Sequence, residues 1–162
     1  RMVERGVRFV LLVHASWDQH ENLDEELGKH CDATDAPVGA LLGDLKQRGL
    51  LDETMVVWGG EFGRTPLGEF EREFDGEAPG RDHHPGCFSM WAAGGGIQGG
   101  QVIGRTDDIG LNITEDPVHI HDLQATMLHA LGLEHTQLTY SFMGRDFRLT
   151  DVGGNIVKKL LA

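Results

Sequence analysis

Short apolar runs alternate with amphipathic stretches along this chain. Val7–Val13 (VRFVLLV) and Thr54–Trp58 (TMVVW) are continuous apolar runs of the length expected for buried strands. Cys87–Ala93 (CFSMWAA) is a third candidate strand, and it leads into a Gly94–Gly96 turn. The first run predicts a strand buried on both faces, and the other two are strand-like.

Two stretches carry the period of an amphipathic helix. The first is predicted to begin with Asp35 as its N-cap, to hold Pro37 in its first turn and to end near Gly49. The second is predicted over about 121–131, with Gly132 as its stop. Their apolar stripes are Val38, Leu41, Leu42 and Leu45 in the first, and Ile120, Leu123, Met127, Leu128 and Leu131 in the second.

The alternation of strands and helices predicts the fold class. Its spacing is typical of a single α/β domain whose mostly parallel sheet has right-handed crossovers. A chain of 162 residues is long enough to build a core for such a domain. Gly68–Gly80, with four Glu and one Asp, is the best candidate for a mobile acidic loop.

Charge and composition exclude some partners. The chain carries 14 Lys and Arg against 26 Asp and Glu, a net charge of −12, which disfavours binding to nucleic acid. No apolar run approaches the roughly 20 residues of a membrane-spanning helix. The two cysteines, Cys31 and Cys87, form no CxxC motif, and the sequence leaves open whether they pair, are buried or are free.

Three polar clusters adjoin the predicted strands. His14–His20 (HASWDQH) follows the first strand, Gly59–Pro66 (GGEFGRTP) follows the second, and Arg81–Pro85 (RDHHP) precedes the third. Ligands of open α/β sheets bind beyond the carboxyl ends of the strands, so the first two clusters are expected at one sheet edge. Imidazole and carboxylate groups suit zinc and manganese. The pattern indicates a metal-dependent hydrolase.

Four residues are the candidate metal ligands. They are Asp18, His20, Glu61 and His84. His84 is preferred over His83, and at most one of these neighbours should face the metal, because successive side chains of an extended segment point opposite ways. The alternatives stay open: Asp18 and His20 could form a surface turn, and Glu61 could cap the turn that follows it.

Other polar residues have weaker or different roles. Arg64 is the candidate for binding an anionic substrate group in a bidentate manner, although it could equally pair with the acidic loop. His14 could be a ligand, a partner of a ligand or a buried histidine. Gly94–Gly100 lacks the Gly-Lys-Ser/Thr ending of a phosphate loop and is predicted to be a tight turn. Tyr140–Asp151 is predicted to be a salt-bridged strand or edge. The set around the second helix is expected to cap it and cover its surface: His119, His121, Asp122 and His129.

Six stretches of the chain resemble the carboxyl-terminal part of a family of exported, sulfatase-like bacterial proteins of unknown function, within the alkaline phosphatase superfamily. They are Trp17–His20, Val57–Pro66, Gly80–Pro85, Met90–Gly100, Pro117–Leu133 and Gly144–Asp151. The resemblance implies part of an alkaline phosphatase-like three-layer sandwich with a mostly parallel sheet. It also implies an exported location, in the periplasm or at the cell surface.

The resemblance implies metal-dependent hydrolysis of a phosphate or sulfate ester, with a small anionic ester as substrate. Members of the superfamily hold one or two metals through an Asp and a His, then an Asp-His pair, then a late His. Asp18 and His20 resemble the first pair, and His84 resembles the late His. Glu61 stands where the second Asp would be, and Phe62 stands where the second His would be.

The same resemblance implies that the nucleophile lies in an amino-terminal half. We therefore expect this chain to be an incomplete active site by itself, completed by a longer chain or by a partner. Thr65 is the only hydroxyl residue near the second cluster, and no base is predicted beside it. The alternatives are a non-catalytic binding or scaffold domain and a metal-dependent phosphomutase or isomerase. An exposed apolar edge would favour self-association.

Overall fold

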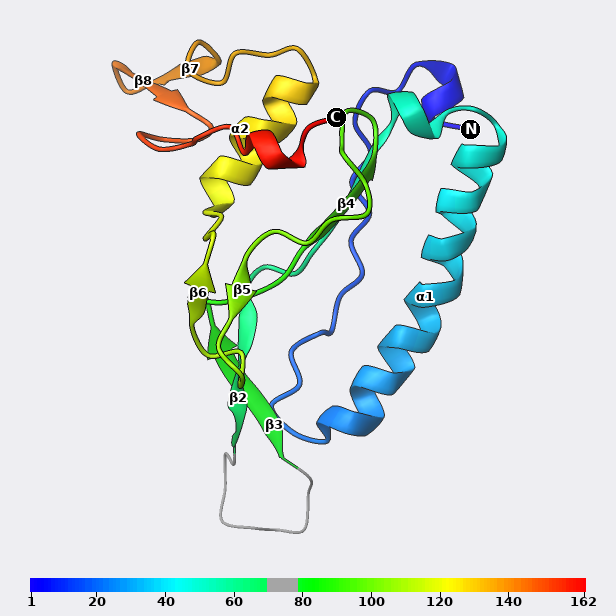
Figure 1. Cartoon of the computed structure of the whole chain (residues 1–162), viewed down its shortest axis with the longest axis vertical. Helices are drawn as coiled ribbons and strands as arrows, with labels where there is room; N and C mark the ends of the chain where they lie inside the picture. Colours follow the sequence, from blue (N-terminus) through cyan, green and yellow to red (C-terminus); the bar gives the residue numbers. More distant parts are fainter. Residues whose placement is uncertain (70–78) are drawn as a thin grey trace. The chain divides into compact units, whose positions relative to one another are not determined.

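The structure of the chain is a computed structural model that describes residues 1–69 and 79–162 (Figure 1). It divides into two compact units, residues 1–54 with 60–89 and residues 55–59 with 90–162. The predicted acidic loop, Gly68–Gly80, therefore lies mostly outside the described residues. No helix in the described part is both long enough and apolar enough to cross a membrane. The exported location stays a prediction.

The first unit is built from one long helix and one hairpin. Its elements are η1 (Val3–Arg5), α1 (Leu23–Gln47), η2 (Leu51–Glu53), β2 (Gly63–Glu69) and β3 (Gly80–His84). Among the described residues of this unit, the buried apolar side chains are Leu45 on α1 and Cys87 just after β3. Both Cys31 and Cys87 are free thiols.

The prediction that the first helix begins at Asp35 is wrong. Helix α1 begins at Leu23 and passes through both Asp35 and Pro37. Pro37 has no N–H to donate to the preceding turn, so the helix loses one backbone hydrogen bond at that point. The predicted end near Gly49 is confirmed, because Arg48 is the C-cap and Gly49 has φ +68°.

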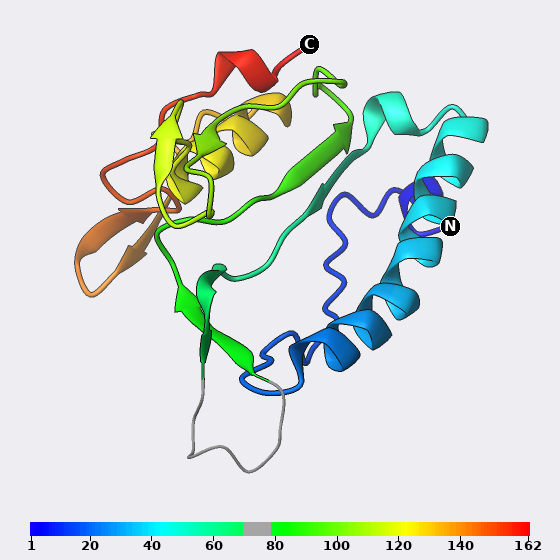
Figure 2. The same cartoon turned by 60° about the horizontal axis from the view of Figure 1, so that its bottom comes forward.

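Val7–Val13, predicted as the first strand, is neither helix nor strand (Figures 1 and 2). Its apolar side chains face solvent, with Phe9 71% and Leu12 79% exposed. A strand needs a partner for its backbone N–H and C=O groups. No ladder joins this segment to another part of the chain that the structure describes. Self-association through an exposed apolar edge stays a prediction.

The predicted fold class is wrong. Among the described residues the strands form four two-stranded antiparallel sheets, with the orders β1-β4, β2-β3, β5-β6 and β7-β8. Neither a mostly parallel sheet nor an alkaline phosphatase-like three-layer sandwich is present in this described part. Parallel pairing requires a crossover connection, whereas most of these strands pair with the next strand along the chain.

The second unit holds the remaining elements. They are β1 (Met55–Trp58), β4 (Trp91–Gly94), β5 (Arg105–Thr106), β6 (Ile113–Glu115), α2 (Ile120–Ala130), β7 (Thr139–Phe142), β8 (Arg145–Arg148) and η3 (Lys158–Leu160). Buried residues gather on α2, where Ala125, Thr126 and Leu128 are buried. Nearby in sequence, buried His135 shares a hydrogen bond of 2.9 Å between its Nδ1 and the Thr150 hydroxyl.

Several local predictions for the second unit are confirmed. Strand β1 lies within the predicted Thr54–Trp58, and α2 matches the predicted helix, with Gly132 at φ +76° after it. Strand β4 covers only the end of the predicted Cys87–Ala93. The Ile97 N–H donates to the Gly94 carbonyl at 2.9 Å, which closes the predicted tight turn.

The charged segment Tyr140–Asp151 is a β-hairpin with an ion pair, as predicted in outline. Strand β7 pairs antiparallel with β8, and Gly144, with φ +78°, lies in the connecting turn. A guanidinium nitrogen of Arg145 lies 3.9 Å from an Asp151 carboxylate oxygen. The two exposed side chains place this pair on the surface.

The amino-terminal end of α2 is a capping box. His119 is the N-cap, and its Nδ1 accepts from the His121 N–H at 3.1 Å. Asp122 accepts from the His119 N–H at 3.2 Å, and it also accepts from the Asn155 N–H at 2.6 Å. These bonds confirm the predicted capping role for His119 and Asp122. Asp122 also ties the helix to the carboxyl-terminal segment.

Replacing Asp122 with alanine is expected to lower the free energy of unfolding by about 1–2 kcal/mol at pH 7, because both bonds are lost. Burial opposes ionisation of Asp122, but the Asn155 and His119 N–H groups outweigh it, and the pKa of this carboxyl is lowered. A lowered pKa stabilises the folded state above the unfolded pKa of about 3.9, and this contribution is lost as pH falls through the folded pKa.

The difference in free energy of unfolding between Asp122→Ala and the wild type should therefore shrink below about pH 4. Denaturant unfolding at pH 7 and at pH 3 measures it. Asp108→Ala, which changes an exposed aspartate of the same unit, is the control. Equal stability of Asp122→Ala and the wild type at pH 7 would contradict the role of this cap.

Candidate metal centre

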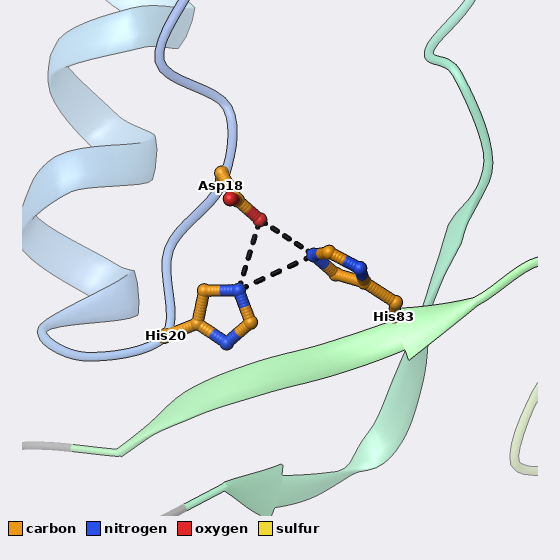
Figure 3. A group of neighbouring side chains, drawn as sticks. All are labelled: Asp18, His20 and His83. Carbon is orange, nitrogen blue, oxygen red and sulfur yellow. Dashed lines mark hydrogen bonds and ion pairs between the residues drawn. The ribbon is translucent and has the colours of Figure 1, made fainter. Parts of the chain in front are cut away.

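Three side chains from distant parts of the chain converge in the first unit (Figure 3). Asp18 Oδ1 lies 2.8 Å from His83 Nε2 and 3.0 Å from His20 Nε2. The two Nε2 atoms lie 3.2 Å from each other. We call these three atoms the Asp18–His20–His83 triangle. Among the described residues it is the one group whose carboxylate, imidazole or thiolate atoms could share an ion.

Backbone contacts hold the segment with Asp18 and His20 against β3. The Arg81 N–H donates to the Gln19 carbonyl at 3.0 Å. Gly80 lies so close to this segment that an added Cβ would come within 1.9 Å of the His20 carbonyl carbon. Only glycine fits at this position. The absence of a side chain at Gly80 allows the His20 backbone to lie directly against strand β3.

The register of the β2–β3 hairpin decides which histidine enters the triangle. Arg64 is the cross-strand partner of His83, and Gly63 is the partner of His84. Directly opposed side chains lie on the same face of an antiparallel pair, and the next residue along the strand points to the other face. His83 therefore shares a face with Arg64, and Arg64 reaches Asp18.

Aromatic contacts anchor the other end of the segment to α1. The Trp17 indole N–H donates to His14 Nδ1 at 2.9 Å. The Trp17 ring lies 5.2 Å from the ring of His30 on α1, and the His14 ring meets the His30 ring edge-on at 5.3 Å. His14 therefore helps to fix the position of Trp17, the neighbour of Asp18, and does not join the triangle.

Arg64 adds a positive charge to the same site. Its Nη1 donates to Asp18 Oδ1 at 2.6 Å, and its Nη2 donates to Glu61 Oε1 at 2.8 Å. The hydrogen bond from His83, followed by that from Arg64, lowers the pKa of Asp18 to about 2. Asp18 is therefore a carboxylate at neutral pH, although its side chain is 59% exposed.

The structure groups the predicted site residues in part. Asp18 and His20 lie together as expected, with His83 as their neighbour. His84 lies outside the triangle, and Glu61 is connected to it through Arg64. The adjacent pair His83-His84 was the sequence signal for this position, but the sequence did not carry the strand register that chooses between them.

The triangle has two ways to satisfy its atoms. An ionised Asp18 brings no hydrogen, and each neutral imidazole carries at most one hydrogen on Nε2. Both imidazoles can donate to Asp18 Oδ1, which gives a hydrogen-bonded cluster without an ion. With both Nε2 atoms unprotonated, the three atoms could instead share one cation. Two imidazoles and one carboxylate are a donor set that fits zinc, manganese or iron.

The sequence model of one protein family, described as a protein of unknown function (DUF1501), matches residues 1–161. No curated protein and no solved structure matches the chain.

Proposed function

The chain belongs to the DUF1501 family. From its Asp18–His20–His83 triangle we propose that it forms the metal-binding part of a metal-dependent hydrolase of phosphate or sulfate esters. The convergence of one carboxylate and two imidazoles is the observation that carries the proposal. The likeness of its motifs to sulfatase-like members of the alkaline phosphatase superfamily supports the choice of ester.

The donor set of the triangle suits a divalent ion. Such an ion would be held by Asp18 Oδ1 and by the Nε2 atoms of His20 and His83, which lie 2.8–3.2 Å from one another. Imidazole and carboxylate ligands suit both zinc and manganese, so both ions enter the test below.

The surroundings suit a small anionic ester. A divalent ion in the triangle would polarise an ester oxygen and offset the negative charge that develops on it. Arg64 supplies a second positive charge beside Asp18. His83 and Asp18 are 44% and 59% exposed, so a substrate can reach the triangle from solvent.

Thr65 is not assigned as the nucleophile. Its hydroxyl donates to the Leu67 carbonyl at 3.1 Å, so its proton is directed at a backbone oxygen that cannot act as a base. This contact favours a second candidate function, an ion-binding domain that does not itself carry out the reaction. Metal binding is common to both functions, and turnover separates them.

Metal titration and turnover of the intact protein test the proposal. The protein is stripped with a chelator and titrated with Mn²⁺ and Zn²⁺ by calorimetry, and is then assayed against aryl phosphate and aryl sulfate esters. We expect one ion per chain and turnover only with metal present. His129→Ala, which alters an exposed histidine on α2, is the control and should behave like the wild type.

Two results would count against this function. Metal binding without turnover on either ester would favour the ion-binding domain. No binding of either ion would reject both functions and leave the triangle as a hydrogen-bonded cluster.

A further inference from the structure

Arg64 occupies the oxygen that a metal in the triangle would need. Its Nη1 lies 2.6 Å from Asp18 Oδ1, the atom that also faces His20 and His83. Its Nη2 donates to Glu61 Oε1 at 2.8 Å and to the Trp17 carbonyl at 3.2 Å. The side chain is only 19% exposed, so these contacts hold the guanidinium beside the triangle.

A divalent ion and a guanidinium cannot share Asp18 Oδ1 at full strength. Both are cations, and each would stand within hydrogen-bond or coordination distance of one oxygen, where their mutual repulsion is strong. Metal binding must therefore weaken the bond from Nη1 to Asp18. The bonds of Nη2 to Glu61 and to the Trp17 carbonyl do not involve the triangle and need not break.

From this competition we propose that Arg64 is a switch between an internal and an external anion. Without metal, Nη1 neutralises Asp18. With metal, Nη1 leaves Asp18 while Nη2 stays on Glu61, and the freed N–H groups bind an oxygen of a tetrahedral oxyanion next to the ion. The inference rests on the proposed metal site and names the substrate class of that site as phosphate- or sulfate-type oxyanions.

Neighbouring groups keep Arg64 in place for this role. The Phe62 ring lies 5.4 Å from the Arg64 Cζ and 4.6 Å from the His83 ring, so it touches both sides of the site. A guanidinium carries separate nitrogens in one plane, so Nη1 can bind an oxygen of a phosphate or sulfate group while Nη2 keeps its bonds to Glu61 and the Trp17 carbonyl. Phe62 offers no metal-binding atom, and its ring packs beside the Arg64 guanidinium and the His83 ring.

The proposal predicts that metal and oxyanion strengthen each other's binding. Sodium sulfate is the probe, and Mn²⁺ affinity of the intact protein is measured by calorimetry with and without it. In the wild type, sulfate should raise the Mn²⁺ affinity about fivefold or more, and Mn²⁺ should raise the sulfate affinity by the same factor. Direct attraction between the ion and sulfate also couples the two affinities, so the part of the effect that depends on Arg64 is measured with Arg64 variants.

Two variants of Arg64 separate competition from anion binding. Arg64→Gln removes the competing cation, so it should bind Mn²⁺ more tightly than the wild type in the absence of sulfate and should lose the sulfate effect. Arg64→Lys keeps the charge but has one nitrogen, which cannot stay on Glu61 and also bind sulfate as Nη2 and Nη1 do, so it should lose most of the sulfate effect. Arg105→Gln, which changes an exposed arginine 3.7 Å from Glu115, is the control and should match the wild type.

The outcomes distinguish this inference from the proposed function. A wild type that binds no Mn²⁺ rejects the metal site, and the switch with it. A wild type that binds Mn²⁺, with Arg64→Gln weaker or with an unchanged sulfate effect, overturns the switch alone. Circular dichroism checks the fold of each variant, and if Arg64→Gln is unfolded, a full sulfate effect in Arg64→Lys overturns the switch.

Discussion

Replacing Asp18 with asparagine is expected to lower the Mn²⁺ affinity of the intact protein about 100-fold or more. Residues that only orient a metal ligand contribute about 10- to 100-fold to metal affinity, and Asp18 would bind the ion directly. The substitution also removes the negative charge on which three donors converge, from His20, His83 and Arg64. The triangle then holds two imidazoles and a neutral amide beside a guanidinium, a set that repels a dication.

Calorimetry with chelator-stripped protein measures this loss. Asp32→Asn is the matched control, because it removes the same charge from an exposed position on α1, and its Mn²⁺ affinity should stay within about twofold of the wild type. If Asp18→Asn binds Mn²⁺ as tightly as Asp32→Asn does, the metal lies elsewhere and the triangle is not its site.

Exchanging the two neighbouring histidines for alanine is expected to give opposite results. His83→Ala should lower the Mn²⁺ affinity about 100-fold, because it removes one of three ligand atoms. His84→Ala should change it by less than about threefold, because His84 lies outside the triangle. The two variants differ from the wild type by the same side chain and are adjacent on one strand, so each is the control for the other.

The result also tests the register of the hairpin. In the structure Arg64 is opposite His83. A one-residue slip would exchange the faces of the two histidines. A large effect from His84→Ala with a small one from His83→Ala would therefore support His84, the ligand predicted from the sequence, and a register one residue away.

Where the sequence predicted an element correctly, the signal was local. Helix α2 combines a regular apolar stripe, a capping box and a glycine stop, all within the helix and its immediate flanks. Strand β1 is a short apolar run rich in valine. Such features fix the backbone through neighbours a few residues apart, so the sequence carries them whatever the rest of the chain does.

The misread elements depended on distant partners or on conflicting local signals. Val7–Val13 has the composition of a strand, but a strand exists only when another segment bonds to it. The start of α1 was misplaced because Asp35 and Pro37 form a typical helix beginning, and yet both lie inside the helix. The prediction of a mostly parallel sheet was wrong for the same reason as the first strand, because apolar periodicity does not say which strands pair.

At the candidate site, the sequence by itself determined the kinds of ligand and two of their positions. Asp18 and His20 lie two residues apart in one segment, and that spacing alone brings them close together. Tertiary structure decided the rest. The close approach of Gly80 to His20 and the pairing of Arg64 with His83 brought His83 and a competing guanidinium to Asp18. Side-chain direction in a strand reverses with each residue, so no reading of the His83-His84 pair could choose between them without the register that the folded hairpin supplies.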